Sequence, residues 1–211
     1  MVNFKKQQIE ELDNLFRANL INSCSGYKSA NLIATRSTEG VSNVAIFSSV
    51  IHLGSDPALL GFILRPATVI RNTYENIKKT NYYTINHIHQ EILSDAHHTS
   101  AKYGLEISEF EMTNLSETVI ENFFAPFVSS APVKIGMKFL EEYVINANQT
   151  ILVVGEIQNI YIDEGLMETD GFVNLSKGRI AAINGLNGYA IPDLKVRLDY
   201  QRPKISVSQV S

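Results

Sequence analysis

A stretch of small and hydroxyl-bearing side chains is the first place in this sequence that could hold a ligand. Residues Asn43–Val50 mix Ser48 and Ser49 with apolar side chains, whereas a buried strand usually carries large apolar residues throughout. Small side chains let a flat ligand approach the backbone, so that N–H and C=O groups can bond its edge. Serine hydroxyls can also donate to phosphate. The same pattern also fits an ordinary half-exposed strand with polar residues on its solvent face.

Four histidines within a short span raise the question of a metal site. His87 and His89 are two residues apart, and His97 and His98 are adjacent. Neither pair places two imidazoles on one helical face, as an i, i+4 pair would. The lone Cys24 also has no partner at metal-ligand or nucleophile spacing. We therefore expect no metal site, and we expect histidines that face solvent or make hydrogen bonds.

The candidate ligand-binding stretch belongs to a predicted run of strand, turn, strand, helix and strand from Val41 to Asn86. Residues 55–57 form the turn, because Asp56 starts it and Pro57 fixes φ. The second strand is expected to end at Arg65–Pro66, because proline cannot extend a hydrogen-bonded ladder. The helix that follows carries three apolar residues on one side: Val69, Tyr74 and Ile77.

An amphipathic helix is predicted near the N-terminus, over residues 4–22. Ile9, Leu12, Phe16 and Leu20 recur there at spacings of three and four, which places them on one helical face. That face needs a partner, which could be the rest of the domain or a second subunit.

Two β-hairpins are predicted on either side of the central run. One joins a strand over residues 27–36 to the strand that starts at Val41, through a turn at residues 37–40. The other joins residues 134–145 to residues 150–162, and its second strand is apolar enough to be central in a sheet.

The segment between the central run and the second hairpin is less regular. Residues 92–102 are a helix candidate. Phe123, Phe124 and Phe127 cluster around Pro126 and could form a lid over a ligand. Most aromatic clusters are core, so we favour core packing.

Composition limits the classes of partner. The chain has 211 residues, 45% of them apolar, and a net charge of −4, which favours neither nucleic acid nor an anionic membrane as a partner. No apolar run approaches the roughly 20 residues that span a bilayer, and the first residues lack the apolar core of a signal peptide. One cysteine allows no internal disulfide, which suits a cytoplasmic protein. We predict one domain over residues 1–211.

The order of these motifs resembles the flavin reductase-like family of FMN-binding split barrels. In that family a small, Ser-rich strand precedes a segment of the form Arg/Lys-Asp-Thr-x-x-Asn-Ile and an aromatic-rich strand that ends at Asn. The sequence has Asn72 where the family more often has Asp, which loses the charge but keeps turn chemistry. The matching segments are 71–73, 76–77, 83–86, 108–110, 169–175, 185–189 and 198–203.

The resemblance implies a mainly β fold with peripheral helices, an FMN-binding split β-barrel whose core covers about residues 27–205. It also implies a homodimer with FMN near the subunit interface. Backbone groups of residues 45–50 would bond the flavin ring, with Ser48 and Ser49 helping. Arg71 and Thr73, at the start of a helix, would hold the phosphate, and Asn86 would orient the ring or the ribityl chain. The predicted cofactor contacts are Asn43, Ala45, Phe47, Ser48, Ser49, Val50, Arg71, Asn72, Thr73, Asn86, His87, Thr99, Ser100 and Tyr189.

Some of these contacts have an alternative interpretation. Thr99 and Ser100 could touch the phosphate or ribityl chain, or could bond backbone near a helix end. Tyr189 could stack on the flavin, or could pack at a subunit interface. The basic side chains near the C-terminal end could meet an anionic cofactor, or could be solvated.

The resemblance implies an oxidoreductase, and three functions stay open. The first is an NAD(P)H-dependent flavin reductase, with NADH or NADPH as donor and with a monooxygenase as a partner for its reduced flavin. The second is a non-catalytic FMN-binding or electron-carrier protein. The third is a flavin-free barrel for another ligand. We assign no catalytic residue, because the cofactor carries the chemistry of hydride transfer, and fold similarity alone does not fix the function.

Overall fold

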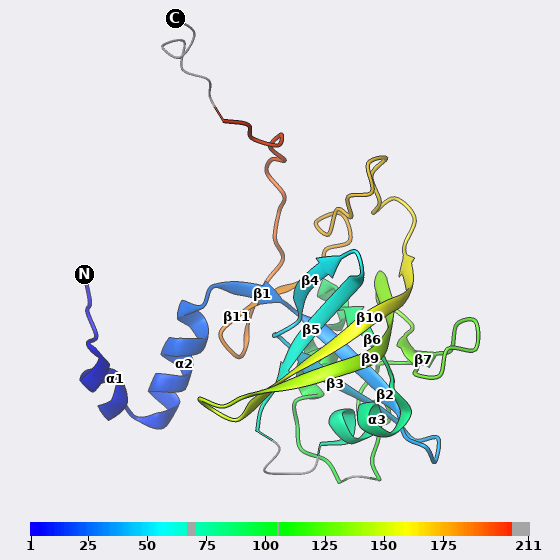
Figure 1. Ribbon diagram of the computed structural model, residues 1–211, viewed down its shortest axis with the longest axis horizontal. Helices are drawn as coiled ribbons and strands as arrows, with labels where there is room; N and C mark the ends of the chain where they lie inside the picture. The colour runs from blue at the N-terminus through cyan, green and yellow to red at the C-terminus, as the bar shows by residue number, and fades with distance from the viewer. Residues whose placement is uncertain (67–70, 105, 204–211) are drawn as a thin grey trace, which may run out of the picture.

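The computed structural model describes residues 1–66, 71–104 and 106–203 (Figure 1). The expected helix residue Val69 lies outside these ranges. The helices are α1 (Lys6–Glu11), α2 (Asn14–Cys24), α3 (Asn72–Thr80) and α4 (Leu93–His98), with a 3-10 turn at Gln90–Ile92. The strands are β1 (Tyr27–Ser29), β2 (Asn31–Arg36), β3 (Ser42–Phe47), β4 (Ile51–Ser55), β5 (Ala58–Leu64), β6 (Tyr82–His87), β7 (Glu117–Thr118), β8 (Phe127–Val128), β9 (Val133–Ile145), β10 (Thr150–Ile162), β11 (Ala182–Asn184) and β12 (Gly188–Ala190).

A seven-stranded antiparallel sheet forms the body of the protein. Its strands lie in the order β3-β2-β6-β9-β10-β5-β4, so β3 and β4 stand at opposite edges. Only residues 48–50 join these two edges, and such a link spans at most about 14 Å. A flat sheet of seven strands would hold its edges about 29 Å apart. The sheet must therefore curve round on itself, and it forms the predicted barrel, split between β3 and β4.

This split corrects one sequence-based expectation. The sequence pattern predicted a single strand centred on Asn43–Val50, followed by a turn and a second strand. In the structure β3 ends at Phe47, and residues 48–50 carry the chain across to β4. The pattern misleads because residues 48–50 contain neither proline nor glycine to mark a break, whereas the sheet can close only if the chain leaves one edge for the other here. The strand after the turn ends at Leu64, as predicted.

The barrel interior is filled by large apolar side chains from facing strands. Phe62 packs edge-on against Phe47, with ring centroids 5.2 Å apart, and against Tyr83, at 5.6 Å. Gly155 makes room for this group, because a Cβ there would lie 2.2 Å from the Tyr83 hydroxyl oxygen. Residues in contact with the interior therefore have little freedom to change size.

The N-terminal segment forms two short helices instead of the single predicted helix. Leu12 is extended, with ψ at 147°, and separates α1 from α2. Asp13 then caps α2 by accepting hydrogen bonds from the backbone N–H groups of Leu15 and Phe16, which favours a new helix start over continuation. Both helices lie outside the barrel in Figure 1, and neither contains a buried residue.

Both predicted hairpins are present, although the strand expected over residues 27–36 is divided into β1 and β2, which belong to different sheets. β2 pairs with β3, and β9 pairs with β10 along their full length. The phenylalanine cluster is core only in part: Phe127 is fully buried, Phe123 is half-buried and Phe124 is 41% exposed. The helix expected over residues 92–102 is shorter and ends at His98. Within the described ranges, the structure has no helix that is both long and apolar enough to cross a membrane.

Candidate functional site

The link between β3 and β4 is held in place by side-chain hydrogen bonds. The Ser49 hydroxyl donates to the Ile63 carbonyl oxygen at 3.0 Å and accepts from the Ile63 N–H at 3.1 Å. The Ser29 hydroxyl donates to the Val50 carbonyl oxygen at 3.4 Å. Ser48, between the strands, is half-buried. The link is therefore a fixed platform at the split, and the hydroxyl of Ser49 is used to build it.

The second half of β3, residues 45–47, leads directly into this link. Ala45 and Phe47 are half-buried, while Asn43 and Val44 are buried. The Phe47 ring packs on the barrel interior, against Phe62. Backbone contacts from residues 45–50 to a flat ligand thus stay a prediction that the geometry of this edge allows.

A buried polar cluster connects β3 to the start of α3. In the amide orientation that satisfies both ends, Asn43 Nδ2 donates to Glu109 Oε2 at 3.1 Å, and its Oδ1 accepts from Thr73 Oγ1 at 3.1 Å. Glu109 also accepts from the Val44 N–H at 3.2 Å. Burial raises the pKa of the Glu109 carboxyl. The predicted site residues Asn43 and Thr73 are therefore brought together, and Thr73 is fixed in position.

Arg71 precedes α3 at the N-cap position, and Asn72 is the first helical residue. The Arg71 side chain makes no capping hydrogen bond, and its Nε is buried with no hydrogen-bond partner among the described residues. A buried guanidinium N–H without a partner costs free energy. An anion bound here would remove that cost.

Asn86 has a structural role in the barrel. It is fully buried; its Nδ2 donates to the Leu32 carbonyl oxygen at 3.2 Å and to Thr84 Oγ1 at 2.8 Å. Its Oδ1 accepts from the Val128 N–H at 3.0 Å. The amide is thus fully used inside the barrel, which favours a structural role over the predicted contact with the flavin.

Three predicted contacts lie around α4. Thr99 is buried, and its hydroxyl donates to the Ala96 carbonyl oxygen at 2.7 Å, which is the helix-end alternative. Ser100 is exposed, and its N–H donates to the His97 carbonyl oxygen. The Tyr189 hydroxyl lies 2.8 Å from His97 Nδ1, so it ties β12 to α4. These bonds stabilise the helix end, and a ligand contact from the three residues stays a prediction.

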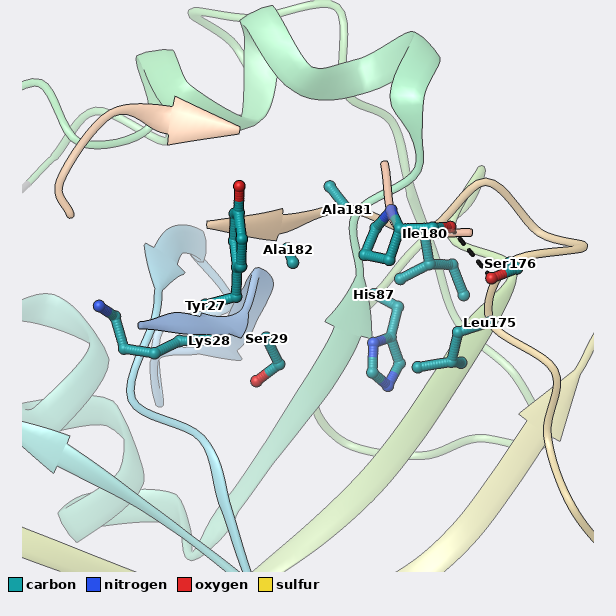
Figure 2. A pocket seen from close by; sticks show the side chains of 10 residues that line it. Tyr27, Lys28, Ser29, His87, Leu175, Ser176, Ile180, Ala181 and Ala182 are labelled. Atoms are coloured by element: carbon teal, nitrogen blue, oxygen red, sulfur yellow. Dashed lines mark hydrogen bonds between the residues drawn. The ribbon is translucent and has the colours of Figure 1, made fainter. Parts of the chain in front are cut away.

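His87, at the end of β6, lines a cavity of about 270 Å³ (Figure 2). Its Nδ1 is buried without a hydrogen-bond partner among the described residues. Burial lowers the pKa of His87 to about 4, so the imidazole is neutral at pH 7. This cavity adjoins the link, because Ser29 both lines it and bonds Val50.

Comparison with known proteins places this geometry in a family. The flavin reductase like domain matches residues 25–179. A crystal structure from Shewanella frigidimarina, described as a flavin reductase with a split barrel domain, is 44% identical in sequence and superposes with a TM-score of 0.92. That match covers 95% of this chain and 100% of the other. The chain belongs to the flavin reductase like domain family.

More distant members of this fold have lower sequence identity. Nitrilotriacetate monooxygenase component B from Bacillus cereus is 17% identical, with a TM-score of 0.81 and coverage of 94% of this chain and 98% of the other. Flavoredoxin from Desulfovibrio vulgaris is 19% identical, with a TM-score of 0.72 and coverage of 82% and 91%. At this identity the two neighbours support the split-barrel fold. A comparison with curated proteins gave no match.

Two features of this flavin reductase-like domain escaped the sequence analysis. Glu109 was noted only as part of the family resemblance, although a carboxylate between Ser108 and Phe110 could have signalled a buried acceptor. The cavity has no sequence signal, because its walls come from β1, β6 and the C-terminal segments. The described residues contain no group of three or more His, Cys, Asp or Glu side chains that could hold a metal ion.

Proposed function

We propose that this protein is an FMN-binding oxidoreductase, and specifically an NAD(P)H-dependent flavin reductase. The observation that carries the proposal is the Nε of Arg71, which is buried at the start of α3 and has no hydrogen-bond partner among the described residues. Arg71 follows β5 in the sequence, in a protein of the flavin reductase-like family. A phosphate group is the partner that suits a guanidinium beside a helix start.

Two groups of residues would bind the two ends of FMN, its phosphate and its ring. Arg71, Asn72 and Thr73 would hold the phosphate, with Thr73 fixed by Asn43. The edge from Ala45 to Val50 would bond the ring, through backbone groups more than through the Ser49 hydroxyl, which already bonds Ile63. Thr99, Ser100 and Tyr189 remain candidate contacts to the ribityl chain or ring.

Bound FMN would supply the redox chemistry, by accepting a hydride from NADH or NADPH and passing electrons to an acceptor. The protein would bind the flavin and orient it for the donor. Hydride transfer to a flavin does not require a protein acid or base, which is consistent with the absence of an assigned catalytic residue.

The proposal includes a homodimer. Large apolar side chains stay exposed at the end of the β9–β10 hairpin, where Tyr143 and Val144 are each 53% exposed, and on α2, where Leu15 is 68% exposed. Such surface is commonly covered by another chain. Light scattering after gel filtration would test it: a monomer mass at micromolar concentration would contradict the dimer.

A monooxygenase is the proposed user of the reduced flavin. The support is the name of the B. cereus neighbour, a monooxygenase component. We also propose a cytoplasmic location, because the thiol of Cys24 is free and exposed, and a reducing compartment keeps such thiols reduced.

A non-catalytic FMN-binding or electron-carrier protein is the alternative. The flavoredoxin neighbour shares the split barrel, and a carrier would need the same contacts to FMN.

The decisive experiment is a visible spectrum of the purified protein incubated with FMN, followed by anaerobic addition of NADH and then of NADPH. A protein-bound flavin spectrum that bleaches within seconds would support the reductase. A bound spectrum that persists with both donors would support the carrier. Absence of bound flavin would contradict both.

A further inference from the structure

A cavity that is lined by Ser29, next to the link between β3 and β4, has a lining that the proposed reductase does not use. Its volume is about 270 Å³, and ten residues from β1, β6 and the C-terminal segments line it (Figure 2). For scale, a cavity of about 150 Å³ lined by apolar side chains is known to hold benzene. The space therefore suits one substituted ring.

Half of the lining is aliphatic. Leu175, Ile180, Ala181, Ala182 and Pro192 account for five of the ten residues. Ile180 and Ala181 are each only 3% exposed, so these walls are fixed parts of the core. An apolar lining of this kind favours a hydrocarbon ring over a polar or charged molecule.

The polar side chains of the lining are mostly occupied elsewhere. The Lys28 ammonium donates to the Asn22 carbonyl oxygen and to Ser25 Oγ, both at 2.9 Å, at the end of α2. Figure 2 shows the Lys28 side chain pointing away from His87. The Ser176 hydroxyl donates to the Pro192 carbonyl oxygen at 3.0 Å. Consequently no lysine charge faces the cavity to balance a carboxylate.

His87 is the exception, because its Nδ1 is buried without a partner among the described residues. The ring is neutral at pH 7, since burial lowers its pKa to about 4. A neutral imidazole offers one donor and one acceptor nitrogen. A ligand amide or hydroxyl, which can both donate and accept, would satisfy Nδ1 in either tautomer.

We propose that this cavity binds a neutral single-ring organic molecule whose one amide or hydroxyl substituent hydrogen-bonds to His87 Nδ1. Except for His87, the residues that define the site lie outside the predicted FMN contacts. The site therefore goes beyond the proposed reductase function and can be tested in protein without flavin.

Three probes of similar shape distinguish the effect of ligand charge on affinity from the effect of a hydrogen bond: benzamide, benzoate and toluene. Binding is followed through the imidazole signals of the full-length protein, labelled with ¹⁵N-histidine, both without FMN and with FMN. We expect saturable binding of benzamide that shifts the His87 signal. Benzoate and toluene should each bind about tenfold more weakly. The described lining of the cavity presents no charge to balance the carboxylate of benzoate, and toluene has no group that can hydrogen-bond to His87.

Two variants test the placement. Ala182→Leu fills the cavity, so benzamide binding should be lost while FMN affinity stays unchanged. His87→Leu should remove the roughly tenfold preference for benzamide over toluene, and toluene should still bind. Circular dichroism checks that each variant is folded. If a variant does not fold, the binding measurements on the unmodified protein still test the proposal.

The proposal is overturned if benzamide causes no saturable shift of the His87 signal, or if benzoate binds as tightly as benzamide. Unchanged benzamide binding in folded Ala182→Leu would also overturn it, because the ligand would then lie elsewhere. Failure of FMN to bind would contradict the reductase function and would leave this site intact.

Discussion

The hydroxyl of Ser49 makes two hydrogen bonds to one residue, Ile63: it donates to the carbonyl oxygen at 3.0 Å and accepts from the N–H at 3.1 Å. Ser49 precedes β4, whose first residue, Ile51, pairs with Gly61. The side chain therefore continues the backbone ladder for two more residues along β5. A serine that was predicted to serve a ligand thus holds the crossing segment against the sheet.

Ser49→Val should lower the stability of the barrel. Valine cannot make the two hydrogen bonds of the serine hydroxyl. The partly buried N–H and C=O groups of Ile63 are then unpaired, at a cost of about 1–2 kcal/mol. Ser48→Ala, at the neighbouring position, is the matched control and should change the free energy of unfolding by less than about 0.5 kcal/mol. Urea unfolding followed by fluorescence measures both. Equal stability of the two variants would show that the Ser49 bonds are weak in solution.

Arg71→Ala should weaken FMN binding by about 1.5–3 kcal/mol, the usual contribution of a hydrogen bond to a charged group. Lys79→Ala, in the last turn of the same helix, removes an exposed charge and should leave the affinity unchanged. Fluorescence titration of the flavin gives both dissociation constants. If Arg71→Ala bound FMN with unchanged affinity, the phosphate would have to lie elsewhere.

His87 should make stability depend on pH in the acidic range. Burial lowers its pKa in the folded state to about 4, from 6.5 when exposed. Between these two pH values the unfolded chain binds the proton and the folded protein does not, so stability rises with pH. The contribution is complete above about pH 6.5 and declines as the pH falls towards 4, by up to about 3 kcal/mol.

Unfolding curves at pH 4.5, 5.5 and 7 would measure this dependence. His87→Leu should flatten it, whereas His52→Gln, which changes an exposed residue on β4, should not. An equally steep profile in His87→Leu would assign the effect to other groups.

Glu109 should respond differently to two substitutions. Burial raises the pKa of its carboxyl, so its contribution to stability falls as the pH rises above 4.5. Glu109→Gln keeps an acceptor for the Val44 N–H and loses the buried charge. It should be at least as stable as the native protein at pH 7, with a weaker pH dependence.

Glu109→Ala leaves the Val44 N–H and the Asn43 amide without their acceptor. It should lose about 1–3 kcal/mol at pH 7. Thermal unfolding of the Gln and Ala variants at pH 7 measures their difference in stability. A Gln variant as unstable as the Ala variant would mean that the negative charge itself is required.

Asn86→Ala tests a structural role against a role in ligand binding. Because its amide bonds three partners in the core, the variant should lose at least about 2 kcal/mol of stability. FMN affinity at low temperature, where the variant stays folded, should be nearly unchanged. A large loss of affinity with little loss of stability would restore the sequence-based assignment.

The sequence predicted the parts of the fold that local chemistry determines. Alternating apolar residues and short turns indicated the β2–β3 and β9–β10 hairpins, and Pro66 marked the end of β5. The break after Phe47 has no local signal, because it depends on the closure of a sheet whose edge strands are neighbours in sequence. The family resemblance, carried by the order of several motifs, gave the split barrel that periodicity alone could not.

The candidate site was predicted less completely. The family motif pointed to Arg71 and Thr73, but could not show that Asn43 fixes Thr73 or that Glu109 completes the cluster. The family resemblance implies a ligand contact for Asn86, and only the tertiary structure shows that its amide makes hydrogen bonds inside the barrel. The cavity at His87 combines segments almost the whole chain apart, so only tertiary structure could show it.

The split also determines where the protein is exposed to aggregation. An edge strand offers unpaired backbone groups to any extended chain nearby. On β3 this risk is reduced, because the Glu109 carboxylate occupies the Val44 N–H and the strand begins buried. On β4, Ile51 and Leu53 are 44% and 41% exposed, and among the described residues the strand pairs only with β5. Intermolecular strand addition during overexpression or refolding should therefore start at β4.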